Sequence, residues 1–244
     1  MLKLINYTKV YPNGKVGAED INLEIKKGDI FAFIGHNGAG KTTTIKSIVG
    51  INDITSGDIL IDGKSIKENP IECKSILAYI PDNPDLYETL TGVQYINFVA
   101  NVFGVSKEKC AELTEKYADI LKMKENLNDA IATYSHGMRQ KLALISAFVH
   151  EPKLLILDEP FVGLDPKAGF LVKNLMKDFV KQGGAIFFST HVLEVAEKLC
   201  NKVAIIKDGK IVKSGTMAKI KKDASLEEVF LESENEKSVT SNKK

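Results

Sequence analysis

The sequence predicts an α/β fold with a mostly parallel sheet, flanking helices, an N-terminal antiparallel β subdomain and an inserted α-helical subdomain. Three observations indicate this. Short apolar runs at residues 30–34, 154–157 and 185–188 are typical of buried strands, and helical segments separate them. Residues 21–25 alternate strictly between apolar and polar, as a half-buried strand does. From about residue 86 to residue 150 the apolar spacing becomes helical.

The remaining elements follow from local patterns. Turn sequences such as Asp62-Gly63 and Asp208-Gly209 separate neighbouring strands of predicted hairpins. The other predicted strands lie at residues 58–61, 203–206 and 210–212. The predicted helices lie at residues 93–99, 109–121 and 169–181, with one more that begins near Lys41 and one that ends at Val149.

The domain boundaries come from the same patterns. Residues 1–231 are expected to form one domain, with the helical subdomain inserted at about residues 86–150. Residues 232–244 contain one apolar residue, Val239, and are predicted to form a disordered tail.

Composition and charge exclude several function classes. The chain has 244 residues, with 33 lysines and arginines against 32 aspartates and glutamates, and a formal charge of +1. This balance gives no overall attraction to nucleic acid, so no nucleic-acid partner is expected. No apolar run approaches the roughly 18–20 residues of a membrane-spanning helix. Three widely separated cysteines fit a reduced, cytoplasmic chain without a zinc site.

A glycine-rich segment carries the clearest chemical signal. Residues 35–42 match the pattern G-x-x-x-x-G-K-[ST] between a buried strand and a helix. Its backbone N–H groups can surround phosphate oxygens, and the helix N-terminus adds partial positive charge. Lys41 can reach the β- and γ-phosphates of a nucleoside triphosphate, and the Thr42 hydroxyl can bind Mg²⁺. The predicted nucleotide-binding residues are Gly35, His36, Asn37, Gly38, Ala39, Gly40, Lys41, Thr42 and Thr43.

Polar residues that can serve hydrolysis end two other strands. Asp158 and Glu159 follow the apolar run at 154–157, where Asp158 can hold Mg²⁺ and Glu159 can polarise a water in line with the γ-phosphate. His191 follows the strand at 185–188, and its position suggests contact with the γ-phosphate or the attacking water. Lys41, Glu159 and His191 are therefore the predicted catalytic residues.

The arginine content poses a further question. Arg139 is the only arginine, and the other 32 basic residues are lysines. Several arginines on the transferring phosphate, as many phosphoryl-transfer enzymes use, are therefore not available. Ser135 and Gly137 open a long helix, whose exposed N–H groups form a second predicted anion site.

With these motifs in this order, the chain resembles the ATP-binding subunits of ATP-binding cassette (ABC) transporters over nearly its whole length. Residues 35–42 correspond to the Walker A motif, residues 154–159 to Walker B and residues 135–140 to the signature sequence. Residues 163–166 match the D-loop. His191 matches the H-loop, and Tyr11 lies where the family places an aromatic that stacks on adenine. The resemblance implies a P-loop NTPase core with ATP and Mg²⁺ as cofactors.

The resemblance also implies a head-to-tail dimer that drives a separate membrane permease. Ser135, Gly137 and Asp165 would act in trans on the nucleotide bound by the other subunit. The chain would lie on the inner face of the cell membrane, held there by the permease. Whether the second subunit is identical or a sister chain stays open, as does the transported substrate.

Two segments depart from the usual family pattern. The signature usually reads Leu-Ser-Gly-Gly-Gln, whereas His136 and Met138 stand here in place of Gly and Gln. Asp82 occupies the position of the Q-loop glutamine, where it can bind Mg²⁺ or position water but adds a negative charge. Both variants, and the segment at residues 225–230, resemble the exporter branch that pairs with ABC-2-type permeases.

The helical subdomain is expected to bind the permease. In this family a groove beside the Q-loop receives a permease helix, and we assign it to residues 84–91 and nearby aromatics. Most of the aromatic side chains in this subdomain are expected to pack internally; they are Tyr87, Tyr95, Phe98, Phe103 and Tyr117.

The sequence leaves two alternative functions open. One is a soluble ABC-type ATPase in DNA repair or on the ribosome, whose relatives usually carry two cassettes or long coiled-coil insertions. The other is a regulatory module that senses ATP without turnover, which Glu159 disfavours because only hydrolysis needs that carboxylate.

Overall fold

The computed structural model describes residues 1–222 and 224–235. Its centre is a six-stranded sheet with the order β10-β9-β3-β8-β7-β6, in which only β10 runs antiparallel to its neighbour. This confirms the predicted mostly parallel sheet. Its strands are β3 (Ile30–Ile34), β6 (Leu77–Ile80), β7 (Leu154–Asp158), β8 (Ala185–Thr190), β9 (Lys202–Lys207) and β10 (Lys210–Thr216).

Both faces of the central sheet are buried because side chains alternate along each strand. Ile30, Ala32 and Ile34 of β3 point into one apolar core, whereas Phe31 and Phe33 point into a second core on the opposite face. The same alternation holds in β7, β8 and β9. A strand that packs on both sides needs apolar residues at every position, and this explains the continuous apolar runs in the sequence.

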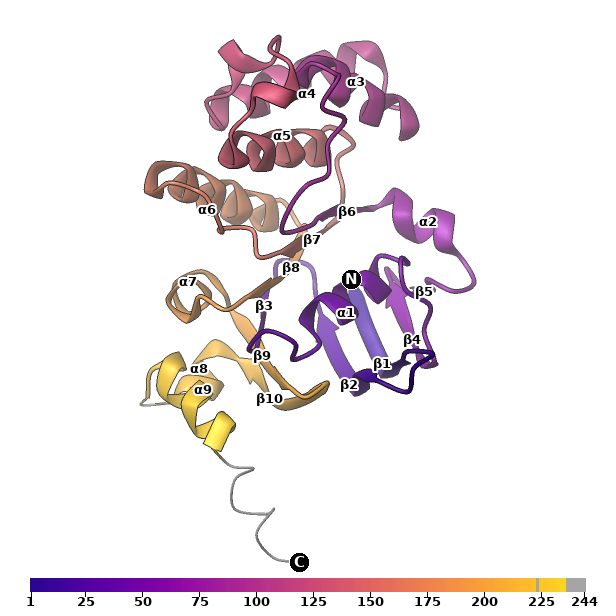
Figure 1. Ribbon diagram of the computed structural model, residues 1–244, viewed down its shortest axis with the longest axis vertical. Helices are drawn as coiled ribbons and strands as arrows, with labels where there is room; N and C mark the ends of the chain where they lie inside the picture. The colour runs from indigo at the N-terminus through magenta and orange to yellow at the C-terminus, as the bar shows by residue number, and fades with distance from the viewer. Residues whose placement is uncertain (223, 236–244) are drawn as a thin grey trace, which may run out of the picture.

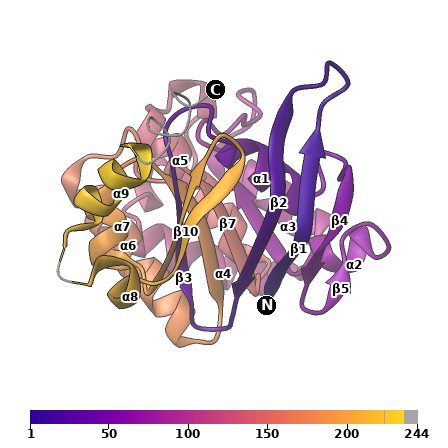
Figure 2. The same ribbon diagram turned by 90° about the horizontal axis from the view of Figure 1, so that it is seen from below.

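A second, antiparallel sheet of four strands covers one face of the central sheet (Figure 2). Helix α1 (Lys41–Ile48) contributes Ile45 and Ile48 to the core between the two sheets. At Gly57 the backbone φ is +76°, and a Cβ there would lie 2.2 Å from the carbonyl oxygen of Asn6. Glycine therefore lets the second sheet close. Its strands are β1 (Leu2–Val10), β2 (Val16–Ile25), β4 (Ser56–Ile61) and β5 (Lys64–Ser65).

The helical subdomain forms a separate group at the top of Figure 1. It contains α3 (Gly92–Val102), α4 (Lys107–Ile120) and α5 (His136–Val149), joined by short 3₁₀ turns at Lys124–Asn126 and Ile131–Thr133. A side chain caps the N-terminus of each helix, namely Thr91, Ser106 and Ser135 respectively.

Helices that follow strands of the central sheet in the chain cover its other face. These are α6 (Pro166–Lys181), α7 (Leu193–Leu199), α8 (Met217–Lys221) and α9 (Leu226–Asn235), while α2 (Pro70–Ser75) lies before β6. No helix in the described part of the chain is long and apolar enough to cross a membrane.

The prediction of a disordered tail at residues 232–244 was wrong for residues 232–235, because helix α9 continues to Asn235. Ser233 is buried, and its carbonyl oxygen accepts a hydrogen bond from Lys207 Nζ at 3.3 Å. This contact with β9 stabilises a turn of helix that is too polar to be recognised from the sequence. Residues 236–244 lie outside the described residues.

A buried hydrogen bond joins the antiparallel sheet to α1. Tyr7 Oη donates to Ser47 Oγ at 2.7 Å, and burial raises the pKa of Tyr7 to about 12, so the phenol stays protonated at neutral pH. Tyr7→Phe leaves the Ser47 hydroxyl buried without this donor. We expect the free energy of unfolding to fall by about 1–2 kcal/mol in urea titrations.

The double variant Tyr7→Phe/Ser47→Ala provides the control for this prediction. With both polar groups removed, part of the lost stability should return. A single Tyr7→Phe variant as stable as the original chain would show that this bond does not help to hold α1.

Candidate functional site

Neighbouring parallel strands bring the predicted site residues to one edge of the sheet. The glycine-rich loop follows β3, His191 follows β8, Asp158 ends β7 and Asp82 follows β6. Because β3, β8, β7 and β6 are consecutive in the sheet and parallel, their carboxyl ends lie side by side. The pairing of Asp158 with Ser189 in register fixes the height of the carboxylate on this edge.

The glycine-rich loop has the backbone geometry of a phosphate cradle. Gly38 and Gly40 adopt φ values of +84° and +111°, which side chains disfavour. A Cβ on Gly35 would lie 2.5 Å from the carbonyl oxygen of Ile206, and one on Gly40 would lie 2.4 Å from that of Gly17. Gly40 occupies the N-cap of α1 without a side chain, so the first N–H groups of the helix are open to an anion.

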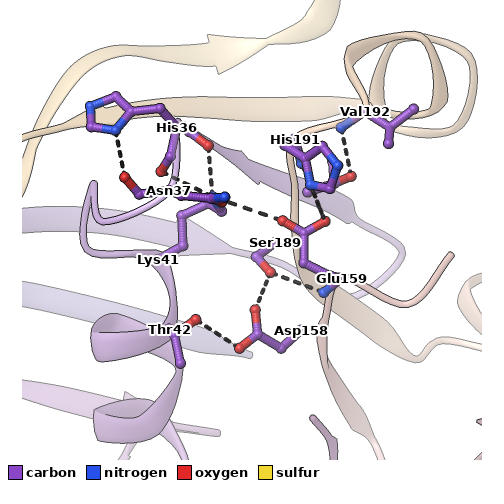
Figure 3. A network of polar contacts seen from close by, with 11 residues as sticks. His36, Asn37, Lys41, Thr42, Asp158, Glu159, Ser189, His191 and Val192 are labelled. Carbon is purple, nitrogen blue, oxygen red and sulfur yellow. Dashed lines mark hydrogen bonds and ion pairs between the residues drawn. The ribbon is translucent and has the colours of Figure 1, made fainter. Parts of the chain in front are cut away.

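Carbonyl groups of the loop hold the ammonium group of Lys41 (Figure 3). Lys41 Nζ donates to the carbonyl oxygens of Gly35 at 2.6 Å and His36 at 3.2 Å, and it lies 3.8 Å from Glu159 Oε1. Burial lowers the pKa of Lys41, while the negative charges of Glu159 and Asp158 oppose this change. The lysine is thus held at the mouth of the cradle, where phosphate oxygens would replace the carbonyl oxygens.

Asp158 connects three elements in this region. Thr42 Oγ1 donates to Asp158 Oδ2 at 2.9 Å, and Ser189 Oγ donates to Asp158 Oδ1. Ser189 Oγ also accepts from the Glu159 N–H at 3.1 Å. The oxygen atoms of the Thr42 hydroxyl and of the Asp158 carboxylate therefore lie side by side at this edge.

This donor set fits magnesium bound together with a nucleotide. Mg²⁺ usually takes one or two protein oxygens and completes its shell with phosphates and water. Within residues 1–222 and 224–235 no group of three or more His, Cys, Asp or Glu side chains could hold a metal ion by itself. Thr42 and Asp158 would thus hold Mg²⁺ only when phosphate oxygens of a bound nucleotide also coordinate it.

Glu159 lies between a lysine and a histidine. Its Oε2 is 3.0 Å from His191 Nδ1 and accepts from the His191 N–H at 3.3 Å, while Oε1 faces Lys41. The Glu159 side chain is 12% exposed and that of His191 is 56% exposed, so the carboxylate is the less solvent-accessible group of the pair. Glu159 also has a positive φ of 49°, which turns the chain sharply at the end of β7.

A cavity of about 480 Å³ brings most of the predicted residues together. Gly35, His36 and Ala39 belong to the loop but do not line the cavity, and His191 reaches it through Glu159. The predicted residues that line it are Tyr11, Asn37, Gly38, Gly40, Lys41, Thr42, Thr43, Asp82, Asp158 and Glu159.

The sequence did not identify four further lining residues, which are Asn13, Lys15, Val16 and Gly17. They belong to the β1–β2 hairpin that folds over the cradle. Only the folded structure shows why a glycine stands at position 17, since a Cβ there would lie 2.7 Å from Thr43 Cγ2 and 2.8 Å from the Tyr11 ring.

Tyr11 borders the cavity on the side of this hairpin. Its hydroxyl lies 3.1 Å from Thr43 Oγ1, and Lys9 Nζ lies 5.4 Å from the ring centroid. The half-buried ring is thus anchored to α1 at its hydroxyl. Stacking of adenine on this ring stays a prediction.

Asp82 lies on the cavity wall together with Asp158 and Glu159. Its backbone carbonyl accepts from Gln140 Nε2 at 3.0 Å. Burial raises the pKa of Asp82, and the charges of Asp158 and Glu159 raise it further. Three carboxylates on one wall repel each other, and a divalent cation would relieve this repulsion.

Comparison with known proteins decides the family. Residues 18–162 match the family described as ABC transporter. The ABC-type transporter ATP-binding protein EcsA of Bacillus subtilis is 36% identical to this chain, and the matched region covers 88% of this chain and 89% of the relative. The chain belongs to the ABC transporter family.

Further comparisons agree with this assignment. The SkfA peptide export ATP-binding protein SkfE of Bacillus subtilis is 36% identical, with 87% of each chain covered. A solved structure of the ATP-binding subunit of an ABC transporter superposes with a TM-score of 0.91 at 33% identity, covering 96% of this chain and 99% of the other. The predicted P-loop NTPase fold and the resemblance to ATP-binding subunits are thereby confirmed.

The ABC signature lies away from the nucleotide cavity of its own chain. Ser135 Oγ accepts from the Met138 N–H at 3.3 Å and caps α5, and Asp165 Oδ1 accepts from the Ala168 N–H at 2.8 Å and caps α6. Neither Ser135 nor Gly137 nor Asp165 lines the cavity. Their action in trans therefore stays a prediction, and it would require a second ABC subunit.

A second cavity, which we call the groove, lies between the helical subdomain and β6 and has a volume of about 420 Å³. Of the segment at residues 84–91, which was expected to form the groove, Pro84, Asp85 and Leu86 line this cavity and residues 87–91 do not. Its other lining residues include Tyr79, Tyr95, Val99, Phe103, Ala143, Ala147 and His150.

The expectation of internal packing was wrong for three of the five aromatics. Tyr87, Phe98 and Phe103 are 57%, 45% and 38% exposed. Tyr87 packs edge-to-face on Tyr95 and Phe98 at the surface, and Phe103 stacks on His150 at 3.8 Å between ring centroids. Helical periodicity cannot separate an apolar surface from a core, because both show the same spacing.

Asp82→Gln restores the family amide and removes one of the three clustered charges. We expect the Mg²⁺ concentration for half-maximal ATP hydrolysis to rise about 3- to 10-fold, the effect of about 1 kcal/mol of lost electrostatic attraction. Phosphate release measured across a magnesium titration checks this.

Asp85→Asn is the matched control, because Asp85 lies three residues away and lines the groove rather than the nucleotide cavity. Identical magnesium curves for Asp82→Gln and the original chain would exclude Asp82 from the metal environment.

Proposed function

We propose that this chain hydrolyses ATP and couples hydrolysis to transport through a separate membrane permease. The observation that carries the proposal is the Glu159 carboxylate, held between Lys41 and His191 on the wall of the nucleotide cavity. A protein that only senses ATP needs the cradle but not this carboxylate. Membership of the ABC transporter family supports the same conclusion.

The geometry suggests how the residues divide the reaction. The open N–H groups of the loop and of α1 bind the phosphates, and Lys41 exchanges its carbonyl partners for β- and γ-phosphate oxygens. Thr42 and Asp158 would hold Mg²⁺, which neutralises developing charge on the phosphates. Glu159 accepts a hydrogen bond from the attacking water, and His191 keeps that carboxylate oriented.

A second subunit completes the site in this proposal. Ser135 lies exposed at the N-terminus of α5, where the helix presents N–H groups to an anion. In a head-to-tail pair these groups and Gly137 would face the γ-phosphate bound by the other subunit, with Asp165 at the interface. Helix termini would thus supply the charge stabilisation that a chain with one arginine lacks.

The partner that we propose is an integral membrane permease, seated in the groove through one of its helices. The subunit would then lie on the inner face of the cell membrane. Export is the direction we favour, because the departures at His136 and Asp82 resemble the exporter branch and SkfE is named as a peptide export protein. The alternative of an ABC-type ATPase without a membrane partner has no comparable support, and no nucleic-acid partner is proposed.

Glu159→Gln should abolish turnover while nucleotide binding persists. Loss of the base should lower ATP hydrolysis by about 100-fold or more, as measured by phosphate release. ATP should then hold two subunits together, which size-exclusion chromatography detects.

Glu151→Gln, an exposed carboxylate outside the nucleotide cavity, is the control and should turn over ATP at the original rate. Unchanged turnover in Glu159→Gln would contradict the role given to this carboxylate.

Phe103→Glu places a charge in the groove and should prevent the permease from binding. The measurement is co-purification from detergent-solubilised membranes of the integral membrane protein that stimulates the ATPase. Phe98→Glu is matched to it, because Phe98 is also exposed but does not line the groove. Equal recovery of that protein with both variants would place the docking site elsewhere.

A further inference from the structure

The only arginine of the chain joins the groove to the signature end of α5. Arg139 Nη1 forms an ion pair with Glu88 Oε1 at 2.6 Å, and Arg139 Nε donates to the carbonyl oxygen of Tyr134 at 3.4 Å. Arg139 lies in the first turn of α5, four residues after Ser135. Glu88 lies in residues 84–91, which we call the rim loop because its first residues line the groove.

Backbone hydrogen bonds reinforce the same junction. The Ala132 N–H donates to the Glu88 carbonyl at 3.2 Å, and the Ile131 N–H donates to the Leu90 carbonyl at 2.9 Å. Only Thr133 separates residues 131 and 132 from Tyr134 and the capping Ser135. The rim loop and the entry to α5 therefore form one hydrogen-bonded unit.

The neighbouring residue of α5 binds the other end of this segment. Gln140 is buried, and its Nε2 donates to the Asp82 carbonyl on the wall of the nucleotide cavity. Consecutive residues of α5 thus hold the chain at Asp82 and at Glu88. The groove-lining Pro84 and Leu86 lie between these two points, so a displacement there acts on two contacts with α5.

The choice of arginine in a lysine-rich chain fits this role. A guanidinium is a planar fork that can donate in two fixed directions at once, here to a carboxylate and to a carbonyl. A lysine ammonium could pair with Glu88 but is a single point of charge at the end of a flexible stem. Exposed ion pairs add little stability, and Glu88 is 59% exposed, so the pair is better suited to positioning than to folding.

We propose that Arg139 and Glu88 are positioning residues that couple the groove to the nucleotide-facing end of α5. The inference rests on the proposed function, in which ATP joins two subunits through that end. Coupling between two sites is reciprocal, so ATP binding changes the affinity of the groove for a permease helix by the same factor by which that helix changes the affinity for ATP.

The reciprocal direction can be tested with this chain and ATP alone. In the Glu159→Gln background, Tyr87→Cys provides an exposed thiol beside Glu88 for an environment-sensitive fluorophore. The native Cys73, Cys110 and Cys200 are buried, so labelling is selective. ATP should change the emission of the label in this background.

Arg139→Gln and Glu88→Gln should each reduce that change at least twofold, while size-exclusion chromatography still shows an ATP-dependent dimer. Arg139→Lys should recover only part of the response, since it keeps the charge without the fork. The exchanged pair Glu88→Arg/Arg139→Glu should recover more than either single variant. Urea unfolding of all variants checks that the fold is intact.

Two results would overturn the coupling. The first is an undiminished ATP response in Arg139→Gln and Glu88→Gln, and the second is an exchanged pair that responds no better than the single variants. A Glu159→Gln background that does not dimerise with ATP is a different failure, since it would overturn the proposed function and the coupling that depends on it.

Discussion

The carboxylate of Asp158 is the contact on which the site depends. It ends β7, accepts from Thr42 on α1 and from Ser189 on β8, and so joins three elements at one edge of the sheet. Ser189 also fixes the backbone of the next residue, because the same hydroxyl accepts a hydrogen bond from the Glu159 N–H. A single buried hydroxyl therefore helps to position both Asp158 and the following residue, Glu159. The strand register, Asp158 opposite Ser189, makes this possible.

Much of this site could be predicted from the sequence because its signals are local. The glycine-rich loop needs particular backbone angles at Gly38 and Gly40, so its residues are specified by the loop itself. Apolar strands that end in Asp158 or in His191 are also visible without a structure, since parallel strands must place their carboxyl ends together.

Other features depend on contacts between distant segments and left no local signal. The Asn13–Gly17 side of the cavity depends on how the first hairpin folds over α1. The last turn of α9 depends on Lys207 of β9, and β6 is a four-residue strand whose membership of the sheet is decided by its pairing with β7. The exposed aromatics of the helical subdomain have the spacing of core residues, and only the packed structure shows that they face solvent.

The imidazole of His136 lies against the backbone of Gly163, where a Cβ would come within 2.3 Å of the ring. The signature and the D-loop, whose contacting residues His136 and Gly163 lie 27 positions apart, therefore have complementary shapes. Grafting a glycine-containing signature from another transporter onto this chain would leave a hollow beside the D-loop, and grafting a bulkier D-loop would collide with the ring. Chimeras of these transport ATPases should exchange the two segments as a pair.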